Sequence, residues 1–163
     1  MRSFSLALLA TGSLFAASAA QAQPLTDHNI SMNMAMAMMQ GTLDQCTKDG
    51  YKVSVVVVDK AGNVMASIKG DGTSPHTMEF AKMKAYTART RGQSSLEFME
   101  ATASGAGALL RQIPGTVAIG GGVPVKLASG EVIGAVAASG APGGEKDDAC
   151  VKAGIAKVAD QLK

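Results

Sequence analysis

The spacing of hydrophobic residues changes several times along this chain, and each change predicts a different structural element. Between Thr26 and Lys48 apolar residues recur at helical spacing in two neighbouring stripes, which predicts a largely buried helix that Thr26 or Asp27 caps and Gly50 ends. Residues 53–58 form a β-branched run typical of a central strand. A turn rich in Asp, Gly and Asn then leads to residues 64–69, whose alternation predicts the partner strand of a hairpin.

The middle of the chain has helical signals. Ser74 and Pro75 favour a helix start, because proline in the first turn loses no needed hydrogen bond, and Gly92 is placed to end that helix. Ser94 and Glu97 have the spacing of a capping box, which predicts another helix. A separate turn or short helix is expected over residues 106–112.

Three further strands are predicted towards the C-terminus. They cover residues 116–119, 123–127 and 131–139, with glycine-containing turns between them, and a final helix is expected over residues 145–162. The whole order is helix, two strands, helices, three strands and helix. The sequence therefore predicts an α/β (α+β) protein in which a five-stranded antiparallel sheet is flanked by helices.

The first 22 residues have the three parts of a secretory signal. Arg2 precedes an apolar stretch, and Ala20-Gln21-Ala22 supplies the small residues that signal peptidase accepts. The stretch is too short and too rich in small residues for a stable membrane span. We therefore expect a signal peptide over residues 1–22, a single domain over residues 23–163, no stable membrane insertion, and a periplasmic or secreted location.

Charge and cysteine content narrow the function classes. The net charge is only +2, and no basic tract interleaves with aromatic residues, so nucleic-acid binding is not expected. An exported chain with two cysteines favours a Cys46–Cys150 disulfide, and two buried free thiols are the alternative.

The chemistry-bearing residues are few. His28 and His76 are the only histidines, and both are predicted at helix starts, where the neutral imidazole that binds haem iron is favoured over the cation. Each is also explained as a partly exposed residue with no special role. No Cys-x-x-Cys-His motif is present, which excludes covalent c-type haem. No nucleophile–base pair is recognisable, so we expect binding rather than catalysis.

Methionines gather in the first predicted helix. Thioethers bind soft Cu(I), which makes a copper site one interpretation. Their positions are also those of flexible core filler, and this second interpretation is favoured. The residues concerned are Met32, Met34, Met36, Met38 and Met39.

A series of short motifs in a fixed order resembles the GlcG/HbpS family, which also includes the C-terminal domain of PduO-type proteins. The motifs cover nearly all of the chain after the signal. They are Val53–Val58 followed by Asp59-x-x-Gly62, Asp71-Gly72, Lys84-Ala85-x-Thr87-Ala88, Ile119-Gly120-Gly121-Gly122-Val123-Pro124, and Gly134 through Ser139-Gly140-Ala141 to Asp147 and Ala153-Gly154.

The resemblance implies a profilin-like fold, homo-oligomers that are often octamers, and, in some members, non-covalent b-type haem with a sensor-kinase partner. It makes His28 the first candidate haem ligand, because a histidine near the domain's start ligates haem in the PduO-type branch, and His76 the second. Motif residues at element ends also suggest an alternative, a pocket for a small-molecule or enzymatic accessory role. That pocket would involve Asp71, Lys84, Thr87 and Pro124.

Overall fold

The computed structural model describes residues 23–163, and the predicted export signal, residues 1–22, lies outside the described residues. The strands are β1 (Ser54–Asp59), β2 (Val64–Lys69), β3 (Gly122–Lys126) and β4 (Val132–Ser139). The helices are α1 (Met32–Lys48), α2 (Thr77–Arg91), α3 (Ser95–Ala101) and α4 (Gly144–Ile155), with 3-10 helices η1 (Gly105–Gln112) and η2 (Ala156–Gln161).

The sheet is antiparallel throughout, with the strand order β2-β1-β4-β3. It has four strands in the described part of the chain, and the fifth strand predicted over residues 116–119 is wrong. The Val117 N–H donates to Thr87 Oγ1 on α2 at 2.8 Å. Because that donor is satisfied by a helix side chain, this segment lies along α2 and does not extend the sheet.

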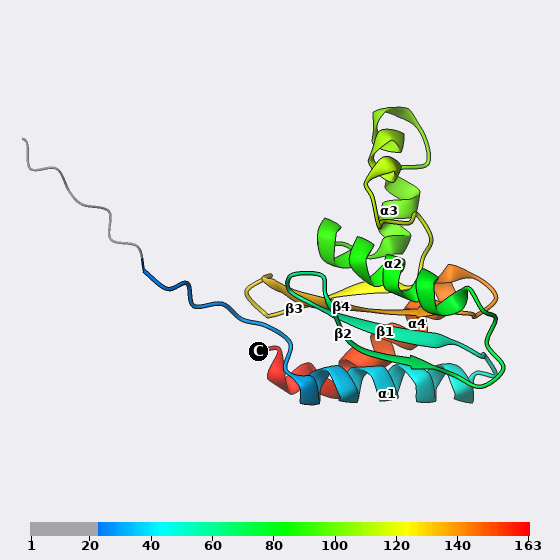
Figure 1. Ribbon diagram of the computed structural model, residues 1–163, viewed down its shortest axis with the longest axis horizontal. Helices are drawn as coiled ribbons and strands as arrows, with labels where there is room; N and C mark the ends of the chain where they lie inside the picture. The colour runs from blue at the N-terminus through cyan, green and yellow to red at the C-terminus, as the bar shows by residue number, and fades with distance from the viewer. Residues whose placement is uncertain (1–22) are drawn as a thin grey trace, which may run out of the picture.

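Helices cover both faces of the sheet, with α1 on one face and α2 on the other (Figure 1). The first face forms a larger core with α4, in which Val55, Val57 and Val136 are fully buried. The α2 face is packed with small residues and valines: Val56, Val58, Ala81, Ala85, Ala88, Ala135 and Ala137. Strand β1 is therefore buried on both faces, as its continuous valine run predicts. Helix α3 and η1 stand beyond α2, away from the sheet (Figure 1).

Some predicted boundaries hold, but the predicted starts of the first and middle helices and the predicted end of the last helix differ from those observed. Gly92 ends α2 with φ 64°, and Ser94 and Glu97 form the predicted capping box. Helix α1, however, begins at Met32, and its cap is Ser31. Ser31 Oγ accepts the Met34 N–H at 3.3 Å, which satisfies a free donor of the first turn. Thr26 and Asp27 therefore lie ahead of the helix in an extended segment.

The methionines of α1 divide between core and surface. Met38 and Met39 are buried, as the core-filler interpretation predicts, whereas Met32 and Met36 are about half exposed, at 52% and 48%.

Within residues 23–163, no helix is long and apolar enough to cross a membrane.

The predicted disulfide is confirmed. Cys46 on α1 and Cys150 on α4 are bonded, and both are fully buried. The bond joins positions 104 residues apart and ties the first helix to the last long one. The alternative of two free thiols is therefore wrong.

Glycines let α1 and α4 approach each other closely. A Cβ added to Gly154 would lie 2.0 Å from Thr42 Oγ1 and 2.5 Å from the Met38 carbonyl oxygen. We therefore expect Gly154→Ala to lower the free energy of unfolding by about 1–3 kcal/mol, the usual cost of overpacking a tight core. Ala149→Ser, on the exposed side of α4, is the control. Urea unfolding of both variants measures the effect, and equal midpoints for the two would contradict this packing.

Candidate functional site

His28 lies in the extended segment before α1, so its predicted position at a helix start is wrong. The segment is anchored at two points. The Ile30 side chain is buried, and a Cβ on Gly134 would meet its Cδ1 at 2.3 Å, so the missing side chain on β4 makes room for it. Asn29 Oδ1 accepts the Lys60 N–H at 3.0 Å. His28 is thus held in place although its own side chain is 70% exposed.

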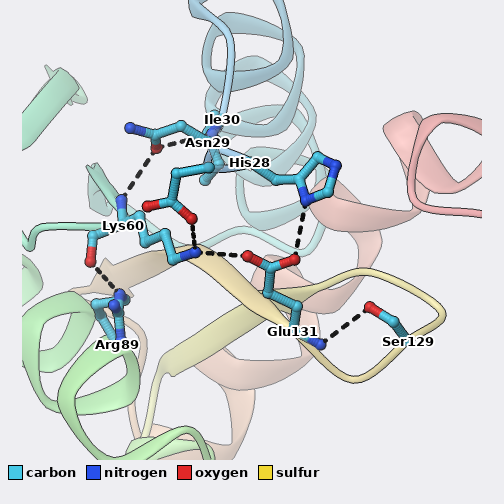
Figure 2. A network of polar contacts seen from close by, with 8 residues as sticks. His28, Asn29, Ile30, Lys60, Arg89, Ser129 and Glu131 are labelled. Carbon is cyan, nitrogen blue, oxygen red and sulfur yellow. Dashed lines mark hydrogen bonds and ion pairs between the residues drawn. The ribbon is translucent and has the colours of Figure 1, made fainter. Parts of the chain in front are cut away.

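A polar network surrounds His28 (Figure 2). Its Nδ1 lies 2.9 Å from Oε2 of Glu131, the residue that precedes β4. Lys60 Nζ, from the β1–β2 turn, donates to Glu131 and also to Asp27. A carboxylate can only accept a hydrogen bond, so Nδ1 carries the proton and a neutral ring keeps its Nε2 lone pair. The chain therefore fixes one ring nitrogen of His28 and leaves the other available.

The charges in this network shift two pKa values. Hydrogen bonding to Asp27 and Glu131 raises the pKa of Lys60 above its ordinary value of 10.5. Hydrogen bonds from Lys60, and secondarily from His28, lower the pKa of Glu131 below 4.5. Because the folded-state pKa of Glu131 is lowered, its contribution to stability is present above pH 4.5 and is lost as the pH falls through the lowered value. Glu131 is thus an anion under ordinary conditions.

We expect Lys60→Met to move the pKa of Glu131 back towards 4.5, because the hydrogen bond from Lys60 is the main cause of its shift. A carboxyl-detected NMR titration of Glu131 measures this directly. Lys69→Met, at the exposed end of β2, is the control and leaves the pKa of Glu131 unchanged. The interpretation fails if Glu131 titrates identically in the wild type and the Lys60 variant.

His76 lies at a different place, at the start of α2 as predicted. It is exposed, and its ring packs edge-on against Phe80 with centroids 5.5 Å apart. It lines an open cavity of about 350 Å³. The wall of that cavity also includes Ser139, the last residue of β4, and the loop that leads into α4.

The two histidines lie near opposite ends of β4. His28 contacts Glu131, just before that strand, whereas His76 shares a cavity with the strand's last residue, Ser139. Eight strand residues at about 3.4 Å each put these ends roughly 25 Å apart. A single chain therefore cannot place both imidazoles on the same haem iron.

A buried ion pair forms part of the cavity wall. Lys84 Nζ on α2 donates to Asp147 Oδ2 on α4 at 2.7 Å and to the Ala138 carbonyl oxygen at 3.2 Å. Both side chains are only 3% exposed. The Ala141 N–H donates to the other Asp147 oxygen at 3.1 Å. Burial raises the pKa of Asp147 above 3.8, although Lys84 opposes that shift.

Glycines at the start of β3 make room for this pair. A Cβ on Gly121 would lie 2.6 Å from Asp147 Cβ and 3.0 Å from Lys84 Nζ. A Cβ on Gly122 would lie 2.2 Å from the Lys84 carbonyl oxygen. The run Gly120-Gly121-Gly122 therefore allows close packing where α2, the sheet edge and α4 meet.

Two of the four residues predicted to share a pocket, Asp71 and Lys84, line different cavities, and neither Thr87 nor Pro124 belongs to the wall of either one. Asp71 is exposed and borders a hollow with Tyr51 and Lys52, whereas Lys84 lines the cavity beside His76. Thr87 is buried against the segment after η1, and Pro124 lies within β3, paired with Ala135. These two cavities therefore give no support to a small-molecule site shared by all four residues.

Three residues that matter at these sites were not found from the sequence. Glu131 and Lys60 hold His28, and Asp147, although noted as a motif residue, was not recognised as the partner of Lys84. Each contact joins residues more than 60 positions apart, so no periodic or local pattern signals it. Among the described residues, no group of three or more His, Cys, Asp or Glu side chains could hold a metal ion.

Comparisons with known proteins agree with this architecture. The sequence model of a family described as "Haem degrading protein HbpS-like" matches residues 30–156. Protein GlcG of Escherichia coli strain K12 is 30% identical over 110 residues, which cover 68% of this chain and 81% of GlcG. The chain belongs to the HbpS-like family.

Solved structures show the same fold. A double mutant of HbpS from Streptomyces reticuli superposes with a TM-score of 0.76 at 31% identity, over 90% of this chain and 97% of that chain. A crystal structure of HbpS gives 0.78 at 32% identity, over 85% and 96% of the two chains. A PduOC:heme complex gives 0.70 at 20% identity, over 79% and 94%, which shows a shared fold alone.

Proposed function

We propose that this chain is an exported protein that binds b-type haem non-covalently through His28 and serves haem scavenging, buffering or sensing. The observation that carries the proposal is the contact between His28 Nδ1 and Glu131 Oε2 at 2.9 Å. Histidines that ligate metals generally donate their other ring N–H to a carboxylate or carbonyl, which fixes the ring and strengthens the ligand. His28 has this arrangement, and its exposed side chain leaves Nε2 accessible.

The surroundings of His28 also suit a large apolar ligand. Leu25, three residues before it, is 87% exposed, and Met32, four residues after it, is 52% exposed. Both can cover apolar ring surface on binding. Lys60 and Glu131 keep the imidazole oriented, because Lys60 donates a hydrogen bond to the Glu131 carboxylate, which in turn accepts one from the His28 ring. The bound haem would supply the redox and spectroscopic properties, and His28 would supply a nitrogen ligand for its iron.

His76 is the competing ligand and lacks the orienting contact. Within the described residues its ring has an aromatic neighbour, Phe80, but no carboxylate or carbonyl partner. The relatives named for haem support the proposal, since the matching family is described as haem degrading and a protein of the same fold was solved as a haem complex. Export rests on residues 1–22, and assembly into homo-oligomers, octamers included, and a sensor-kinase partner rest on the family resemblance.

Haemin titration with Soret spectroscopy tests the proposal. We expect a saturable shifted Soret band in the wild type, loss of that band in His28→Ala, and retention in the matched variant His76→Ala. Glu131→Gln should bind about 10–100-fold more weakly, the usual cost of removing an orienting partner. The absence of a saturable band in the wild type contradicts haem binding, and loss in His76→Ala instead of His28→Ala contradicts the ligand assignment.

A further inference from the structure

The cavity beside His76 has polar residues in a wall that the otherwise apolar α2 face of the sheet helps to form. The α2 face of the sheet is otherwise apolar, with Val56, Val58, Ala135 and Ala137 buried against the helix. On the same strands this face becomes polar at Ser54 and Ser139, which pair across β1 and β4. Both serines are buried. Polar groups that converge in an otherwise apolar wall are the usual mark of a ligand site.

The hydroxyl of Ser139, unlike that of Ser54, is not used by the fold. Ser54 Oγ and Thr77 Oγ1 hydrogen-bond each other at 2.8 Å. Ser139 is only 5% exposed and lines the cavity. Its hydroxyl has no hydrogen-bond partner among residues 23–163 and is not sealed from the cavity. A polar group that borders a cavity and is not used by the fold can hydrogen-bond a ligand there.

Further donors face the same space. An ammonium group has three N–H donors, and Lys84 Nζ uses two of them, for Asp147 and for the Ala138 carbonyl. Gly143 and Gly144, at the N-terminus of the 12-residue α4, line the cavity. The first helical hydrogen bonds of α4 run from the Lys146 and Asp147 N–H groups to the Gly143 carbonyl, and the preceding amides, those of Gly144 and Glu145, have no hydrogen-bond acceptor in the described chain. The partial positive charge of the helix end adds to these donors.

We propose that this cavity binds a small monocarboxylate with a short apolar tail, a site separate from the haem ligand at His28. The donors of the residues that line the cavity select the headgroup: they are the Ser139 hydroxyl, the Lys84 ammonium group and the Gly144 amide. The Asp147 carboxylate, in the same wall, opposes a second negative charge and so disfavours phosphate. Phe80 and Ile119 supply the apolar side of the cavity, whose volume of about 350 Å³ suits a small acid.

An amide NMR titration of the full protein with sodium butyrate at constant ionic strength tests the site. We expect butyrate to shift the Ser139, Gly144 and Glu145 amide signals in a saturable way, and acetate to bind more weakly. Inorganic phosphate should cause no larger shifts of these signals than chloride does. Ser139→Ala should weaken butyrate binding about tenfold, the factor for one lost hydrogen bond to a charged group. Ser67→Ala, on the exposed side of β2, is the matched control and should leave the affinity for butyrate unchanged.

A variant that strengthens binding separates ligand recognition from a structural role. The Glu145 carboxylate lies against Gly143, where an added Cβ would meet its Oε1 at 2.2 Å. Because this carboxylate competes for the α4 N-terminus, Glu145→Gln should tighten butyrate binding several-fold. The proposal is overturned if butyrate shifts no more amides than chloride, if phosphate binds as tightly, or if Ser139→Ala binds as the wild type does. Haemin titration of Ser139→Ala should match the wild type, so failure here leaves the haem proposal standing.

Discussion

Replacing Lys84 by methionine is expected to lower the free energy of unfolding by about 3–5 kcal/mol at neutral pH, the cost of leaving a buried charge without its partner. The Lys84 and Asp147 side chains are each 3% exposed, and Nζ and Oδ2 are 2.7 Å apart. Methionine fills a similar volume without the charge, so the loss reports the ion pair and not a cavity. Urea unfolding measures it.

The effect of Lys84→Met should depend on pH. Burial already raises the pKa of Asp147 above 3.8, and Lys84 opposes that rise. A raised folded-state pKa means that the contribution of Asp147 to stability is present below pH 3.8 and is lost as the pH rises through the folded value. Without Lys84 the carboxyl takes up a proton at still higher pH. The deficit of the variant should therefore shrink as the solution is acidified.

Two further variants complete this test. Lys82→Met, on the same helix but exposed, should change the free energy of unfolding by less than about 0.5 kcal/mol. Lys84→Met/Asp147→Leu should recover part of the loss, because no buried charge remains. A deficit below about 1 kcal/mol in Lys84→Met, or one that is the same at all pH values, would show that the pair does not stabilise the fold in this way.

Removal of the Cys46–Cys150 disulfide is the second large effect. The bond closes a loop between positions 104 residues apart, and the loop-entropy model gives about 4–5 kcal/mol for that length. We expect Cys46→Ala/Cys150→Ala, and the wild type in reductant, to lose stability of this order. The measurement is guanidinium unfolding with and without reductant.

The double variant supplies its own control, since reductant should not change its midpoint. Both sulfurs are fully buried between α1 and α4, so a small part of the loss in the alanine variant is packing. Comparing it with the reduced wild type separates the two contributions. Equal stability of the oxidised and reduced wild type would contradict the entropic account.

Local sequence patterns predicted much of the fold. The valine run of β1, the glycine that ends α2 and the Ser94–Glu97 capping box each depend on neighbours in sequence, and each was predicted correctly. The fifth strand was wrong because the partner of Val117 is a hydroxyl on α2, at Thr87. A hydrophobic pattern cannot show which of two polar groups satisfies a backbone donor.

The candidate sites were less accessible to sequence reasoning. His28 was selected by its type and by family resemblance, but the feature that supports it is Glu131, 103 positions away. Ser139 was one residue of a motif, and only its burial without a partner at a cavity wall distinguishes it. Both features arise where distant segments meet, so they follow from the fold and not from local spacing.

Imidazole rescue of His28→Ala tests the central claim most directly. If His28 Nε2 binds the haem iron, the variant lacks the saturable Soret band, and added imidazole restores the band by replacing the missing side chain. His76→Ala, the matched control, binds haem without rescue. A His28→Ala variant that binds haemin with wild-type affinity and spectrum, in the absence of imidazole, would contradict the account.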